Sequence, residues 1–208
     1  MLIPENMQKI IRVLVNLDRS TTILEISKLS NSSLGGTSKI INQLIDAEYL
    51  LKSKGRIKLK SKKKLVKAWG YCVSINETIN FDFICAEKPK YAMEKIKNLA
   101  QKNNLNYAFT LLSATEIFNP YVYPDKVDLY IKKEDFDTWK ELLLKNNIYP
   151  SEKGNITLYL SKENVFFNSL NINNYYIVSP PQLYIDLFSK GGRYGEAAEK
   201  ILEVIKNV

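Results

Sequence analysis

The stretch LGGTSKIINQLIDAEYLLKSKGRIKLK, residues 34–60, decides the fold of the first third of the chain. Its first half predicts an amphipathic helix over residues 34–47, because apolar or small side chains recur there at helical spacing. These side chains are Thr37, Ile41, Leu44 and Ile45. Its second half predicts a β-hairpin, since two short runs, residues 49–52 and 57–60, flank a turn that contains Gly55.

Two further helices precede this stretch. Residues 4–17 carry an apolar stripe at helical spacing, and Pro4 suits the first position of that helix. A second helix is expected to begin at Thr22, where Thr22 and Glu25 match a capping box. Helix, helix, turn, helix and hairpin is the order of a winged helix-turn-helix, which we therefore predict for residues 1–60.

The remainder of the chain predicts a linking helix within residues 61–78 and a mixed α/β domain over residues 79–208. Strands are expected at residues 81–86, 107–112, 127–132, 156–160 and 175–178. Helices are expected to begin at Pro89, near Phe136 and after Ser179, where Pro180 takes the first helical position and Gln182 pairs with the Ser179 cap. A degenerate nucleotidyltransferase-like fold is one form that such a domain can take.

Charge is distributed unevenly along the chain. Residues 1–70 hold 14 Lys and Arg against 5 Asp and Glu, whereas residues 71–208 hold 16 against 17. This asymmetry predicts a nucleic-acid or anionic-membrane partner for the first third alone. No apolar run is long enough to span a bilayer and no signal peptide is evident, so we expect a cytoplasmic protein without a membrane partner.

The residues expected to bind DNA lie in the third helix and the hairpin. Lys39, Asn42 and Gln43 stand at i, i+3 and i+4, opposite the apolar stripe, and these side-chain types can read base edges in the major groove. The start of the helix is rich in small residues that allow close approach to a phosphate, among them Ser33, Gly36 and Ser38. The alternative interpretation is an ordinary solvated helix face.

Nine basic residues and no acidic residue lie between Lys52 and Lys67. Unrelieved like charge repels itself, and an acidic polymer relieves it through counterion release. Strand periodicity places five cations on one face, where they would follow a phosphate backbone: Lys52, Lys54, Arg56, Lys58 and Lys60. We expect double-stranded DNA as the partner, because the aromatic stacking pattern of RNA-binding modules is missing here. A homodimer is expected on a two-fold operator.

Catalytic chemistry is poorly supported. The chain has no histidine, which removes His-based acid–base catalysis and nearly every common zinc site, and its two cysteines lack metal-ligand spacing. A nucleotidyltransferase needs paired carboxylates for Mg²⁺, but Lys126 stands between Asp125 and Asp128 where an acid is required. We therefore expect no enzyme, no metal and no cofactor, with Asp128 as a solvent-facing strand residue. A nucleotide-transferring enzyme and a protein-interaction adaptor remain as alternatives to a DNA-binding regulator.

Several stretches together resemble the AbiEi-type antitoxin and transcriptional-regulator family of type IV toxin–antitoxin systems. Besides the predicted winged helix, they are KLVKAW (64–69), FTLLSA (109–114), VDLYI (127–131) and VSPPQLYIDL (178–187) followed by Gly191-Gly192-Arg193. The resemblance covers nearly the whole chain. It implies an N-terminal DNA-binding domain that represses its own operon, a C-terminal domain needed for antitoxin action, and a toxin partner that resembles a nucleotidyltransferase.

Overall fold

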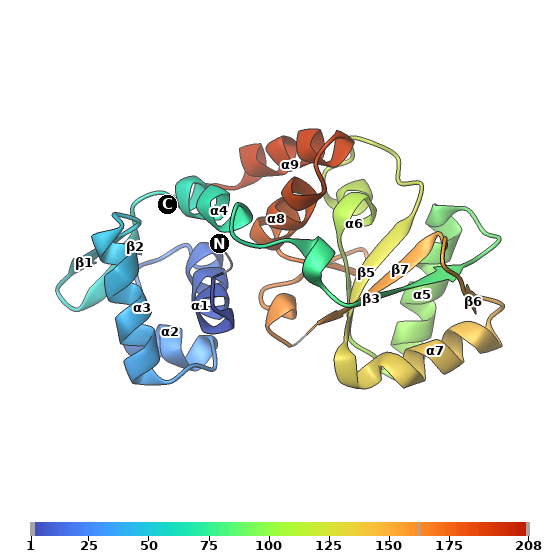
Figure 1. The fold of residues 1–208 in the computed structure, drawn as a ribbon, viewed down its shortest axis with the longest axis horizontal. Coiled ribbons are helices and arrows are strands. Elements are labelled where there is room, and N and C mark those ends of the chain that lie inside the picture. Colours follow the sequence, from blue (N-terminus) through green and yellow to red (C-terminus); the bar gives the residue numbers. More distant parts are fainter. Residues whose placement is uncertain (1–2, 162, 207–208) are drawn as a thin grey trace.

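The computed structural model describes residues 3–161 and 163–206, and its first third holds three helices followed by a hairpin (Figure 1). The helices are α1 (Glu5–Asn16), α2 (Ile23–Leu29) and α3 (Leu34–Asp46), and the hairpin strands are β1 (Leu50–Ser53) and β2 (Arg56–Leu59). These elements follow the predicted order, with ends close to the predicted ones. We call residues 3–59 the N-terminal unit.

Caps fix where the first helices begin. Pro4 immediately precedes α1 and does not occupy its first helical position. The Thr22 hydroxyl accepts a hydrogen bond from the Glu25 backbone N–H at 3.2 Å, as the capping-box pattern predicts. The Glu25 carboxylate does not complete the box, because it accepts hydrogen bonds from the Thr21 hydroxyl and the Arg19 guanidinium.

The hairpin is attached to the helices on both sides. Thr21 exchanges two backbone hydrogen bonds with Ile57, at 3.0 and 2.7 Å, so β2 lies between β1 and the segment that precedes α2. Apolar side chains of the hairpin, Leu50, Ile57 and Leu59, are buried with the apolar stripes of the helices. This packing fixes the position of the hairpin relative to α3.

The chain leaves the N-terminal unit through α4 (Lys62–Gly70) and the short 3₁₀ helix η1 (Ile75–Glu77). The linking helix therefore ends at Gly70, earlier than predicted. Gly70 lies directly against the side chains of Phe188 and Tyr184, so this helix packs closely on α8 (Pro180–Lys190). Trp69 is fully buried and contributes to the same contact region.

A seven-stranded sheet forms the centre of the second part, in the order β6-β3-β7-β5-β4-β9-β8. The strands are β3 (Asn80–Ile84), β4 (Tyr107–Phe109), β5 (Val127–Lys132), β6 (Tyr149–Pro150), β7 (Ile156–Ser161), β8 (Leu170–Ile172) and β9 (Tyr175–Ile177). The pairs β5–β7 and β4–β9 are parallel, and the other neighbouring pairs are antiparallel. The fold is thus mixed α/β, as predicted.

The two faces of the sheet differ in chemistry. Helices α5 (Pro89–Asn103) and α7 (Phe136–Lys145) cover one face, which is apolar, and α6 (Leu111–Phe118) and α8 cover the other (Figure 1). Helix α9 (Arg193–Val204) packs against α8 and α6. The register places Asp82, Thr157 and Asp128 side by side on this second face, with Tyr130 and Tyr159 in the next row. A polar layer therefore lies beneath α8.

Two local predictions for this part are wrong. The strand expected over residues 107–112 ends at Phe109, because the backbone turns at Leu111 (φ +50°) and continues as α6. Ser179 precedes α8 as expected, but its hydroxyl makes no capping bond, and the Gln182 side chain, which was expected to pair with this cap, bonds Arg12 and Asp186 instead. Among the described helices, none combines the length and the apolar character required to cross a bilayer.

Candidate nucleic-acid interface

Helix α3 presents the predicted polar face to solvent. Lys39, Asn42 and Gln43 are all exposed, while Thr37, Ile41 and Leu44 on the opposite side are buried. Ile45, which was expected to face inward, is only partly buried. The spacing of the three polar side chains therefore places them together on one accessible face.

The start of α3 is held by its own cap. The Ser33 hydroxyl accepts a hydrogen bond from the Gly36 backbone N–H at 3.2 Å, and Ser38 is half-buried. A Cβ atom at Gly36 would lie 2.9 Å from the Ser33 oxygen and 3.3 Å from the Asn6 amide nitrogen. The small residues here thus have a structural role, because they allow the cap to pack closely against α1. The sequence pattern alone does not distinguish this role from phosphate binding.

The hairpin turns through Lys54 and Gly55, which both have positive φ angles, +48° and +75°. This is the backbone of a two-residue hairpin loop whose twist matches that of the strands. The pairs Lys52–Ile57, Leu51–Lys58 and Ser53–Arg56 face each other across the strands. A residue and its cross-strand partner lie on the same face of a sheet.

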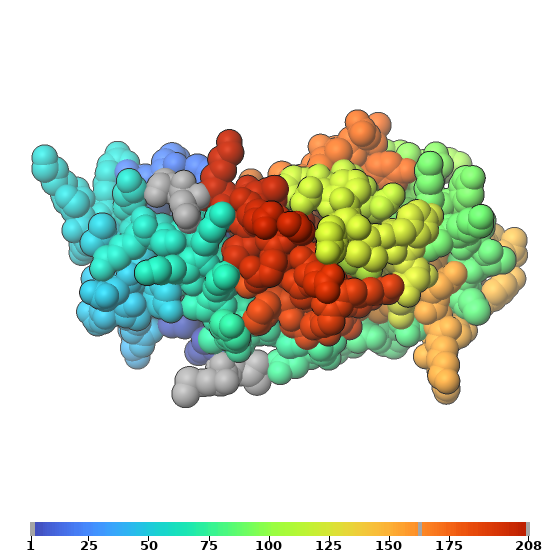
Figure 2. Space-filling view, turned by 90° about the horizontal axis from the view of Figure 1, so that it is seen from above, coloured from blue at the N-terminus to red at the C-terminus, as the bar shows by residue number. Residues whose placement is uncertain are grey.

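The prediction that five cations share one face of the hairpin is therefore wrong. Lys52 lies on the face of Ile57, whereas Arg56 and Lys58 lie on the other face. The reason is geometric: a two-residue loop pairs an even-numbered residue with an odd-numbered one, so strand alternation is not continuous through the turn. All the same, Lys52, Lys54, Arg56 and Lys58 are exposed, and the hairpin projects from the end of the molecule opposite the sheet (Figures 1 and 2).

The cations of residues 52–67, which we call the basic segment, are not equivalent in the fold. Lys60 pairs with Glu48 at 3.6 Å, Lys67 pairs with Glu199 of α9 at 3.7 Å, and the buried Lys62 ammonium pairs with Asp18. Glu48 precedes the hairpin, whereas Asp18 and Glu199 come from distant parts of the sequence. By contrast, Lys52, Lys54 and Lys58 have no ion pair with any residue that the structure describes.

Arg56 keeps its charge exposed while its guanidinium donates a hydrogen bond to the Ser20 carbonyl oxygen at 3.4 Å. We call Lys52, Lys54, Arg56 and Lys58 the hairpin tip. The structure thus concentrates uncompensated positive charge on the lysines of the hairpin tip, and the hairpin lies next to α3 (Figure 1).

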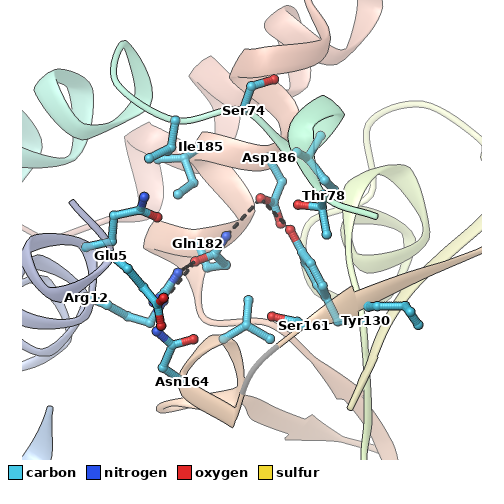
Figure 3. Close-up of a pocket in the computed structure, with 15 residues that line it drawn as sticks. Glu5, Arg12, Ser74, Thr78, Tyr130, Ser161, Asn164, Gln182, Ile185 and Asp186 are labelled. Carbon is cyan, nitrogen blue, oxygen red and sulfur yellow. Dashed lines mark hydrogen bonds between the residues drawn. The ribbon is translucent and has the colours of Figure 1, made fainter. Parts of the chain in front are cut away.

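A second polar centre, which sequence reasoning missed, lies between α1 and α8. The Arg12 guanidinium donates from Nε and Nη2 to the Gln182 side-chain oxygen, at 3.0 and 2.7 Å, and lies 5.1 Å from the centre of the Trp69 ring. The Gln182 amide donates in turn to Asp186 at 2.8 Å (Figure 3). Arg12 and Gln182 are 170 positions apart, so no local pattern could have indicated the contact.

Asp186 is completely enclosed by this network. Besides Gln182, the hydroxyls of Thr110 and Tyr130 donate to its carboxylate at 2.6 and 3.1 Å. Burial raises the pKa of Asp186 to about 6, although these three hydrogen bonds and the charge of Arg12 oppose the increase. The carboxylate is therefore held in place by donors from β5, α8 and the segment between β4 and α6.

The residues considered for metal-dependent nucleotidyl transfer are spread over separate contacts. Asp125 is exposed and pairs with Arg193 at 2.5 Å, and Lys126 pairs with Asp82 at 3.1 Å. Asp128 is buried, not solvent-facing as predicted, because its strand lies beneath α6 and α8; burial raises its pKa to about 6. Within the described residues, no three Cys, Asp or Glu side chains are grouped as metal ligands.

Comparison with known proteins agrees with the family resemblance. Residues 58–206 match the family described as "Transcriptional regulator, AbiEi antitoxin, Type IV TA system". No curated protein matches the chain. The matched residues begin in β2, so most of the N-terminal unit lies outside the match, while α4, the sheet and its covering helices lie within it. Since the match spans well over half of its residues, the chain belongs to the AbiEi antitoxin family of type IV toxin–antitoxin systems.

Proposed function

We propose that this antitoxin is a DNA-binding repressor of its own operon, with the N-terminal unit acting as a winged helix-turn-helix. The observation that carries the proposal is the hairpin tip, whose lysines have no acidic partner among the described residues. The hairpin packs against α3, whose polar side chains are exposed. Exposed, uncompensated cations are what a phosphate backbone neutralises through counterion release. A helix of this kind fits the major groove of duplex DNA.

The two surfaces take different roles in this proposal. Lys39, Asn42 and Gln43 read base edges, because Asn and Gln can bond an adenine bidentately and Lys can reach guanine or phosphate. The hairpin tip contacts the phosphate backbone and carries little sequence information.

The start of α3 remains a proposed phosphate contact. The backbone N–H groups and positive end of the helix dipole lie there, beside Ser33, Gly36 and Ser38. The Ser33 oxygen already accepts the capping bond from Gly36, so its remaining contribution would be the hydroxyl proton.

The assembly follows from the size of the site. One winged helix covers a short stretch of DNA, so we propose that two copies bind a two-fold operator as a homodimer. The second partner that we propose is a nucleotidyltransferase-like toxin, countered by the sheet domain. To test this part, the product of the neighbouring gene is expressed in cells with and without this chain. We expect it to stop growth when expressed alone, and we expect co-expression of this chain to restore growth.

DNA binding is tested by fluorescence anisotropy on two duplexes, one from the region upstream of the chain's own gene and one of shuffled sequence. We expect tight binding to the first, weaker binding to the second, and a steep loss of both between about 50 and 200 mM KCl. A promoter–reporter fusion then measures autorepression. Absence of any duplex binding at the lowest salt concentration would refute the proposal.

A further inference from the structure

A polar cavity of about 200 Å³ lies where the N-terminal unit meets the sheet domain (Figure 3). Its walls are α1, the segment around η1, the region after β7, and α8. Tyr130 of β5 and Leu160 and Ser161 of β7 bring the cavity to the carboxyl ends of two adjacent parallel strands. This is the position at which α/β folds commonly bind small ligands.

Arg12 lines this cavity with its charge only partly satisfied. The residue is 5% exposed, and two of its nitrogens share the single Gln182 oxygen, while Nη1 has no hydrogen-bond partner among the described residues. A buried guanidinium is normally paired with a carboxylate or phosphate. Here its direct partners are a neutral amide and the Trp69 ring, and burial lowers the pKa of Arg12 to about 10.

Asp186 does not supply the missing partner. Its two oxygens already accept hydrogen bonds from Thr110, Gln182 and Tyr130, and the Gln182 amide stands between it and Arg12. The Arg12 guanidinium therefore has no direct carboxylate partner among the described residues.

The other cavity walls offer hydrogen bonds without much fixed charge. Ser74, Thr78, Gln8 and Asn164 contribute hydroxyl and amide groups. Glu5 also lines the cavity, but it is half-exposed and pairs with Lys9 at 3.1 Å. Such walls suit a ligand that carries hydroxyl or amino groups beside its anionic group.

We propose that this cavity binds a small molecule bearing a carboxylate or a phosphate, with Arg12 as its charged partner. At roughly 30 Å³ per water, the volume corresponds to several waters or one small metabolite. Arg12 belongs to α1 of the N-terminal unit, and Gln182 belongs to α8, which covers the seven-stranded sheet. The ligand would thus bind both parts at once, and an effect on operator affinity would follow if the proposed function holds.

The full chain with Trp139→Phe tests the binding, because Trp69 is then the single tryptophan and lies against Arg12. Sodium phosphate, sodium lactate and glycine are titrated at constant ionic strength, with sodium chloride as the reference. We expect at least one of the three to change Trp69 emission saturably and to raise Tm, as ligands of the folded state do. A response to phosphate alone assigns a phosphate ligand, and a response to lactate or glycine assigns a carboxylate.

Two variants locate the binding. Asn164→Asp adds a negative charge to the cavity wall and leaves the Arg12 contacts intact, and we expect at least tenfold weaker binding. Asn98→Asp makes the same change on the exposed side of α5 and should leave binding unchanged. Arg12→Gln should abolish binding if it folds.

Responses equal to that of chloride for all three compounds overturn the proposal. If Asn164→Asp binds the compound with the same affinity as the chain without this change, the proposal is also overturned. The readout involves no DNA, so either result leaves the proposed repressor function standing.

Discussion

The two ends of the basic segment have the same composition and different surroundings. At the hairpin tip, the lysines project into solvent with no ion pair to the described residues, whereas Lys60, Lys62 and Lys67 each pair with an acid. The difference shows that a run of lysines predicts a polyanion site only for those members that the fold leaves uncompensated. We call Lys60, Lys62 and Lys67 the base of the segment.

The comparison also separates two physical roles. Lys62 and Lys67 of the base tie α4 to the rest of the molecule, since Asp18 precedes α2 and Glu199 lies in α9. The lysines of the hairpin tip make no such tie, so their mutual repulsion is not relieved by the described residues. Substitutions at the tip should therefore change DNA binding, and substitutions at the base should change stability.

The largest effect is expected from the triple variant Lys52→Gln/Lys54→Gln/Lys58→Gln. Each lost phosphate contact should reduce the slope of log affinity against log salt by about 1, so the slope should fall by about 3 on operator and random duplexes alike. Anisotropy titrations over a series of KCl concentrations measure it. The free energy of unfolding should change little, because these side chains are exposed and unpaired.

The matched control removes three cations from α4, as Lys63→Gln/Lys64→Gln/Lys67→Gln. The net charge of the two triple variants is equal, and only the positions differ. Equal loss of slope in both would mean that net charge alone governs binding, and the distinction between the hairpin tip and α4 would be lost.

The next effect concerns sequence preference. Asn42→Ala should weaken the free energy of binding to the operator by about 1–3 kcal/mol and change binding to random DNA little. The reason is that the variant loses a base contact and keeps every phosphate contact. Asn98→Ala, on the exposed side of α5, provides the control. Competition between operator and shuffled duplexes measures the ratio of affinities, and an unchanged ratio in Asn42→Ala would remove this residue from base recognition.

Local patterns predicted the elements of the N-terminal unit well. The apolar stripe of α3 and its exposed polar face follow directly from residue spacing, and the turn at Gly55 follows from the short runs that flank it. The prediction that the hairpin cations share one face was wrong, because the face of each side chain depends on cross-strand register, and register changes with the number of residues in the loop.

Contacts between distant segments could not be predicted at all. Asp18 and Glu199 neutralise parts of the basic segment only after folding, and Gln182 bonds Arg12 although its position three residues after Ser179 suggested a capping role. Asp128 alternates correctly for a strand, yet the face it occupies is covered by α6 and α8. In each case the tertiary partner, and not the local pattern, decides what the side chain does.

A smaller effect is expected at the base of the segment. Asp18→Asn removes the charged partner of the buried Lys62 ammonium and should lower the free energy of unfolding by about 1 kcal/mol, a value reduced by the exposure of Asp18. Chemical denaturation measures it, with Glu152→Gln in an exposed loop as the control. DNA affinity should not fall, since a negative charge has been removed. Weakened duplex binding with unchanged stability would contradict this assignment.

The smallest effect concerns Lys60, the member of the base that is nearest in sequence to the hairpin tip. Its partner Glu48 is exposed, so Glu48→Gln should change the free energy of unfolding by less than about 0.5 kcal/mol. If the freed Lys60 ammonium then reaches the phosphate backbone, the salt slope should steepen by up to about 1. An unchanged slope would place Lys60 with the structural cations and end the phosphate-binding surface at Lys58. Because stability barely changes, the anisotropy titration alone decides whether Lys60 can add to the phosphate contacts of the hairpin tip.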